Sequence, residues 1–115
     1  MSGRAQFRLR VYRDEVVAIG PGKVALLEAI AETGSISAAA KQLGMSYRRA
    51  WMLVEELNQN LKAPAVGTLT GGAHGGGTVL TAEGEALIRL YRGIETRARD
   101  AVADELDELT RLLAR

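Results

Sequence analysis

Two apolar helical stripes joined by a short corner constrain this chain more than any other feature of its sequence. The first stripe, at helical spacing, consists of Ile36, Ala39, Ala40 and Leu43. Gly44 then interrupts the pattern, and Ser46 is placed to cap a second helix. Helices that cross steeply over a short turn need a small residue at their contact and a residue that tolerates positive φ at the corner. Ala40 and Gly44 meet these two needs, so the spacing predicts a helix-turn-helix.

The second helix, expected over residues 47–61, has two chemically different faces when projected at 3.6 residues per turn. The face expected to be buried carries Tyr47, Ala50, Val54, Leu57 and Leu61. The opposite face carries Arg48, Arg49, Met52, Glu55, Glu56 and Gln59. Both arginines lie in the first turn, which is typical of a recognition helix whose N-terminal end enters the major groove. The alternative is a solvated face with incidental charges.

The segments around this pair predict a mainly α (α+β) fold, a winged helix-turn-helix. An N-terminal β-hairpin is expected over residues 6–19, and a helix over residues 22–32 ends at Gly34. Two short strands, 66–70 and 78–80, enclose a glycine-rich tip, and Thr81 caps a final helix that runs to about Leu113. The expected division is residues 1–20 for the hairpin, 21–81 for the DNA-binding domain and 82–115 for the dimerisation helix.

The glycine-rich tip, residues 71–77, does not have the context of a phosphate-binding loop. A Walker loop needs Gly-Lys-Ser/Thr at the start of a helix, and this tip has no lysine and returns into a strand. No βαβ unit follows, which argues against a dinucleotide site. We therefore interpret the segment as the wing. Its His74 is expected to be a wing-tip contact or a solvent residue, with metal ligation as the alternative, and no metal site is predicted.

The final helix carries a heptad-like apolar seam with a local stutter near Ala98–Val102. The seam residues, expected to mediate dimerisation, are Leu87, Tyr91, Ile94, Ala98, Val102, Leu106, Leu109 and Leu113. A helix of roughly 32 residues is about 48 Å long, more than a small domain can cover. A homodimer is the simplest partner for the excess. The alternative is a helix that breaks and folds back on its own domain.

Composition excludes several classes of protein. The chain has no cysteine and one histidine, and it shows no convergent carboxylate pair, so we do not expect an enzyme. No apolar stretch approaches a membrane span or a signal peptide, so we expect a cytoplasmic protein without membrane contact. The net charge is only +1, but residues 1–20 carry +2 and residues 81–115 carry −2. This asymmetry is typical of a protein that binds a polyanion through its N-terminal half and assembles through its C-terminal segment.

Several strings of residues together resemble the N-terminal domain of the molybdate-responsive ModE regulators, which are relatives of the LysR-type DNA-binding domain. They span about residues 21–95. They are Gly34-Ser35-Ile36-Ser37, Ala40-Lys41, Gly44-Met45-Ser46-Tyr47, Ala50-Trp51, Leu57-Asn58, Gly71-Gly72, Gly75-Gly76-Gly77 and Leu80-Thr81, with Gly84, Leu87, Ile88, Leu90 and Tyr91. The Ser-Tyr-x-x-Ala-Trp helix start combined with this wing is specific, whereas a helix-turn-helix alone is generic.

The resemblance implies a homodimeric transcriptional regulator that binds palindromic operator DNA through the second helix and the wing. The residues expected to contact double-stranded DNA are Ser35, Ser37, Lys41, Ser46, Tyr47, Arg48, Arg49, Met52, His74 and Thr78. Classical members also carry C-terminal oxyanion-binding domains, and this sequence ends at Arg115. Molybdate sensing is therefore not carried over, no cofactor is expected, and any effector is left open. The alternative function is a dimeric adaptor that binds protein on the same fold.

Overall fold

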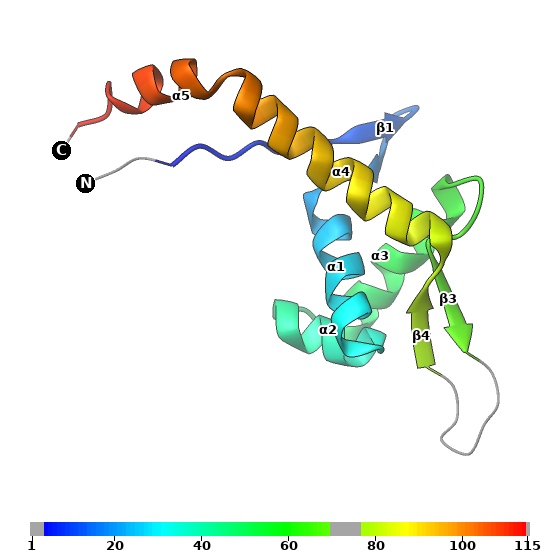
Figure 1. The fold of residues 1–115 in the computed structure, drawn as a ribbon. Coiled ribbons are helices and arrows are strands. Elements are labelled where there is room, and N and C mark those ends of the chain that lie inside the picture. The colour runs from blue at the N-terminus through cyan, green and yellow to red at the C-terminus, as the bar shows by residue number, and fades with distance from the viewer. Residues whose placement is uncertain (1–3, 70–76, 115) are drawn as a thin grey trace.

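The computed structural model describes residues 4–69 and 77–114. His74, expected at the wing tip, lies outside these residues. In chain order the elements are β1 (Val11–Arg13), β2 (Val16–Ile19), α1 (Pro21–Thr33), α2 (Ile36–Leu43), α3 (Tyr47–Asn60), β3 (Val66–Leu69), β4 (Gly77–Leu80), α4 (Ala82–Ala101) and α5 (Ala103–Thr110). Figure 1 shows α1, α2 and α3 clustered below α4, with the β3–β4 wing beside α3. The mainly helical winged helix-turn-helix predicted from the sequence is confirmed.

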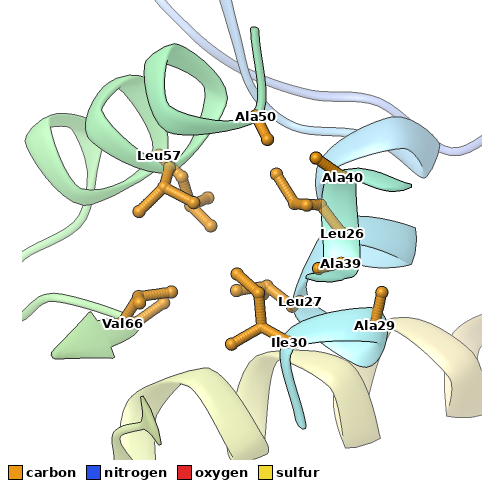
Figure 2. Close-up of a cluster of buried hydrophobic side chains, with 11 residues drawn as sticks. Leu26, Leu27, Ala29, Ile30, Ala39, Ala40, Ala50, Leu57 and Val66 are labelled. Atoms are coloured by element: carbon orange, nitrogen blue, oxygen red, sulfur yellow. The ribbon is translucent and has the colours of Figure 1, made fainter. Parts of the chain in front are cut away.

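The core lies where α1, α2, α3 and the first strand of the wing meet (Figure 2). Its largest fully buried side chains are Val24, Leu26, Leu27, Ile30 and Leu57. Each buried aliphatic side chain of this size contributes about 1.5–3 kcal/mol of transfer free energy. Between the helices lie Ala39, Ala40 and Ala50, whose small side chains allow the helices to approach closely. Thus α1 is the central helix of the domain.

The corner between α2 and α3 has the local chemistry that the sequence predicts. Gly44 adopts φ +70°, and its N–H donates to the carbonyls of Ala40 and Lys41. Gly34, which ends α1, adopts φ +76°. A side chain at either position would be strained because L-residues rarely adopt positive φ. These two glycines therefore set where α1 and α2 end.

The N-terminal hairpin is shorter than expected. β1 pairs with β2 in antiparallel register from Val11 to Arg13, and Asp14 at the turn has φ +55°. The expectation that strand pairing starts near Gln6 is wrong, because β2 ends at Ile19 and Pro21, which has no N–H, opens α1. Residues 4–10 instead form an extended segment, the N-terminal arm, that passes α4 (Figure 1).

A buried lysine links the hairpin to the helices. The ammonium of Lys23, in α1, donates to the carbonyl of Val17 at 2.5 Å and pairs with the carboxylate of Glu56, in α3. Lys23 is buried, whereas the Glu56 side chain is half exposed. A buried cation is tolerated only when it is paired and hydrogen-bonded. These contacts therefore hold β2, α1 and α3 in one arrangement.

The last helical segment differs from the single helix expected. It is interrupted at Val102, with φ −120° and ψ 24°, so that α4 and α5 are separate helices. The segment does not fold back on its own domain, since α5 has no buried residue and projects from the body in Figure 1.

Of the helices in the described ranges, none combines the length and hydropathy that a membrane span requires.

A network around Arg92 fixes α4 against α1. Its guanidinium donates to both carboxylate oxygens of Glu28, at 2.6 and 2.9 Å, and to Glu95 at 2.7 Å. The hydrogen bond from Arg92 lowers the pKa of the Glu28 carboxyl, against the opposing effect of partial burial. Bidentate pairs of this kind have a defined geometry. They therefore set the direction in which α4 leaves the body.

Replacing Arg92 with Met is expected to lower the free energy of unfolding by about 1 kcal/mol at neutral pH, because solvent screens these partly exposed charges. Since the pKa of Glu28 is lowered in the folded chain, this contribution is present above the ordinary value of 4.5 and is lost as pH falls through the folded value. Urea denaturation should therefore show a smaller difference from the wild type at about pH 3. If the stability difference between Arg92→Met and the wild type is the same at both pH values, the ion pair between Arg92 and Glu28 does not account for it. Arg89→Met, on the exposed face of α4, is the matched control.

Candidate nucleic-acid interface

Serine caps fix the first turns of both helices of the helix-turn-helix. The Ser35 hydroxyl oxygen accepts a hydrogen bond from the Ala38 N–H at 2.9 Å, and that of Ser46 accepts one from the Arg49 N–H at 3.1 Å. Both residues have extended backbones, as an N-cap requires. Each hydroxyl still has its own O–H to donate. The two helix N-termini, which favour anions, thus carry free hydroxyl donors.

The exposed face of α3 holds several of the side chains predicted to contact DNA. Arg48, Arg49 and Met52 are exposed, while Ala50, Val54 and Leu57 are buried on the opposite side. Tyr47 is also exposed, so its predicted place on the buried face is wrong. Tyr47 is the first residue of α3, where no preceding turn exists against which to pack it. Leu61, also expected to be buried, is half-buried just beyond the helix.

Trp51 is a residue of this face that sequence reasoning missed. Its side chain is 47% exposed, one helical turn after Tyr47. Residues four apart lie on the same face of a helix, so the Tyr47–Trp51 spacing was the signal that could have indicated it. An exposed indole is uncommon because it leaves a large apolar area in water. The face of α3 therefore combines two arginines with two aromatic rings.

A groove of about 300 Å³ lies where α2, α3 and the wing meet. It brings together four of the predicted residues, Ser35, Ser37, Tyr47 and Thr78, and adds Thr68 of β3, which the sequence did not indicate. The Thr78 N–H donates to the Gly34 carbonyl at 3.1 Å, which ties β4 to the corner between α1 and α2. The groove is thus lined by hydroxyl groups from α2, α3 and both strands of the wing.

A second hollow, of about 290 Å³, lies along α3. It is lined by Ser46, Arg48, Arg49 and Met52, with Leu53 and Glu56 at its edge. Lys41 is exposed near the end of α2 and lines neither hollow. Arg48 and Arg49 make no ion pair within the described ranges. Their guanidinium groups are therefore available to an external anion or to a base edge.

The wing is attached to the body through the backbone of Ala65. The Asn58 amide donates to the Val66 carbonyl at 3.1 Å, and its oxygen accepts from the N–H groups of Ala65 and Val66 at 2.9 and 3.3 Å. The Ala65 carbonyl accepts from the Thr81 N–H at 2.9 Å. These bonds place the roots of both strands at the end of α3, which positions the groove.

The seam predicted for dimerisation is only partly free. Tyr91 is 3% exposed, and its hydroxyl donates to the Leu9 carbonyl at 2.8 Å, so it packs within its own chain. Leu87 packs against the core, and Ala98, Val102 and Leu106 are half-buried. The exposed members are Ile94, Leu109 and Leu113, to which the structure adds Leu90 and Leu112. The free apolar face of α4 is therefore centred on Leu90 and Ile94.

Comparisons with known proteins agree with this geometry. A family model described as "Bacterial regulatory helix-turn-helix protein, lysR family" matches residues 22–85. The chain is 53% identical over 77 residues to the molybdenum-pterin-binding protein MopB of Rhodobacter capsulatus, covering 67% of this chain and 28% of MopB. It is 38% identical over 105 residues to the DNA-binding transcriptional dual regulator ModE of Escherichia coli K12, covering 89% of this chain and 40% of ModE.

Solved structures show the same fold. Full-length CbnR complexed with its target DNA matches with a TM-score of 0.54 and 25% identity, over 73% of this chain and 27% of CbnR. The CbnR DNA-binding domain in complex with DNA matches with a TM-score of 0.54 and 24% identity, over 74% of this chain and 93% of that domain. The resemblance to ModE-type regulators is confirmed by the curated relatives, of which the chain spans less than half the length.

Proposed function

This chain belongs to the LysR family of bacterial regulatory helix-turn-helix proteins, and we propose that it is a transcriptional regulator of the ModE type that binds operator DNA sequence-specifically. The observation that carries the proposal is the exposure of Arg48 and Arg49 in the first turn of α3, the turn that also supplies Tyr47 to the groove where α2, α3 and the wing meet. Helix N-termini, hydroxyl donors and free guanidinium groups are the chemistry that a DNA duplex requires.

Each group on this face has a distinct role. Arg48 and Arg49 are the candidates for bidentate hydrogen bonds to guanine O6 and N7. Met52 offers an apolar contact to a thymine methyl group. The hydroxyl groups of the groove and the Lys41 ammonium contact phosphates, which fix the register of the protein on the duplex. His74 is the proposed contact of the wing tip with the backbone.

The active species in this proposal is a homodimer on a palindromic operator. Residues 21–81 form the DNA-binding domain, and residues 82–115 form the assembly segment. Support comes from the exposed Leu90 and Ile94 and from an adjoining apolar groove of about 430 Å³, whose lining includes Ile19, Leu61 and Leu87. A two-fold axis through a protein dimer matches the two-fold symmetry of a palindrome.

The names of the relatives connect those proteins with molybdenum. We therefore place the operator of this chain among genes of molybdenum transport or of molybdenum enzymes.

The test is binding of the full chain to genomic DNA fragments at two salt concentrations. Wild-type affinity should fall steeply with salt, because phosphate contacts release condensed counterions. The double variant Arg48→Ala/Arg49→Ala should bind its operator at least about thirtyfold more weakly, since it loses two base contacts of about 1–3 kcal/mol each. Arg89→Ala/Arg99→Ala, which removes two cations from α4, should leave operator affinity unchanged.

Two outcomes speak against the proposal. Unchanged operator affinity in the Arg48/Arg49 variant excludes α3 as the reading helix. The absence of any salt-dependent affinity for DNA favours instead a dimeric adaptor that binds protein, to which the low net charge of +1 is suited.

A further inference from the structure

Two surfaces of opposite charge project from the same side of the body. One is the N-terminal arm, residues 4–10, and the other is α5 with the residues that follow it (Figure 1). Within the described ranges, none of the three ion pairs joins them. Both are built from exposed charged side chains beside apolar ones, so each is suited to a partner of complementary chemistry.

The arm alternates between two kinds of residue. Ala5, Phe7 and Leu9 are half-buried, whereas the intervening residues Arg4, Gln6, Arg8 and Arg10 are exposed. This period of two is that of an extended strand with one covered face. The Tyr91 hydroxyl holds the Leu9 carbonyl at 2.8 Å, which anchors the arm to α4. The arm therefore presents a row of three guanidinium groups and no acid to the solvent.

The α5 segment has the opposite character. The acids of the helix are Asp104, Glu105, Asp107 and Glu108, and none of its residues is buried. The helix itself contains no basic residue, and the exposed Arg111 follows it. Leu109 and Leu112 are 61% and 80% exposed. A helix this short is marginal in water unless its apolar side packs against something. Its leucines and its unpaired charges both indicate a partner that is basic and partly apolar.

We infer that in the homodimer α5 of each copy packs against the N-terminal arm of the other copy. The inference rests on the homodimer of the proposed function. Packing α5 against α5 would bring four acids against four acids, and packing arm against arm would bring arginines together. Packing α5 against the partner's arm is the pairing of these surfaces that joins opposite charges. A two-fold axis between the projecting segments makes this contact twice in each dimer.

The test is a charge-reversal experiment on the full chain, with dimer dissociation measured by sedimentation at low and high salt. Arg4→Glu/Arg8→Glu reverses the arm, and Glu105→Lys/Glu108→Lys reverses α5. Each variant alone should dissociate about tenfold more readily than the wild type at low salt, because the attraction becomes repulsion. An equimolar mixture of the two should form heterodimers of nearly wild-type stability. Glu15→Lys, an exposed reversal outside both surfaces, should leave dimer dissociation unchanged.

The outcomes separate the inference from the proposals on which it rests. A stable wild-type dimer that ignores both reversals overturns the arm–α5 contact and leaves the homodimer standing. Restoration only when all four substitutions share one chain, and not in the mixture, shows that α5 packs against its own arm and also overturns the inference. A wild-type monomer that still binds operator DNA removes the homodimer together with this contact. If Arg4→Glu/Arg8→Glu weakens DNA binding and leaves dimer dissociation unchanged, the arm contacts DNA and not α5 of the other copy.

Discussion

Replacing Gly84 with Ala should cost about 3 kcal/mol of folding stability, an unusually large effect for one methyl group. Gly84 is buried in the first turn of α4. A Cβ atom there would lie 2.2 Å from the Ala65 carbonyl oxygen and 3.1 Å from its carbonyl carbon. Both atoms belong to the backbone, so no change of rotamer relieves the clash. The turn must move away from β3, which also strains the bond from the Thr81 N–H to the Ala65 carbonyl.

The same helix offers a matched control for this substitution. An added Cβ at Gly93 meets nothing within 4 Å, so Gly93→Ala changes the same atoms in open space. It should raise stability by up to about 1 kcal/mol, because alanine is the better helix former. Urea denaturation followed by circular dichroism measures both variants. If Gly84→Ala and Gly93→Ala change the free energy of unfolding in the same direction, α4 does not approach Ala65 as closely as described.

Replacing Asn58 with Ala should also cost about 3 kcal/mol, through lost hydrogen bonds rather than a clash. The Asn58 amide makes three bonds to the backbone of Ala65 and Val66, which are both buried. Without it, buried N–H and C=O groups lose partners that water does not easily replace. The wing loses its attachment to α3 as well, so affinity for operator DNA should fall together with stability.

Asn60 provides the comparison for Asn58. Its amide donates to the Glu56 carbonyl of its own helix and accepts from Arg13, in contacts that are exposed to solvent. Asn60→Ala should therefore cost less than about 1 kcal/mol. Equal losses of stability for Asn58→Ala and Asn60→Ala would mean that the bonds to Ala65 and Val66 contribute little.

Features set by short-range chemistry were predictable from the sequence. The left-handed conformation of Gly44, the cap at Ser46 and the small contact at Ala40 each depend on a few neighbouring residues. The same holds for the exposure of Arg48 and Arg49, because a helix projection depends only on spacing.

Features that depend on distant residues were not predictable. The apolar period correctly marks Tyr91 as a residue that must be covered, but its hydroxyl bonds to the Leu9 carbonyl, which lies 82 positions away in the chain. Periodicity shows that a face is covered and not what covers it. The contact between Gly84 and Ala65 and the place of Thr68 in the groove depend in the same way on chain packing. The break at Val102 coincides with the stutter in the seam, yet no proline or glycine marks it.

Trp51 gives the chain an optical property. It is the only tryptophan in the sequence, and its indole is partly exposed on the same face of α3 as Arg48. The emission of an indole depends on how much water surrounds it and on what stacks against it. Fluorescence excited in this ring therefore comes from α3 alone, with no background from elsewhere in the chain. The emission of Trp51 can therefore report, in real time and without an added label, when a ligand occupies that face of α3.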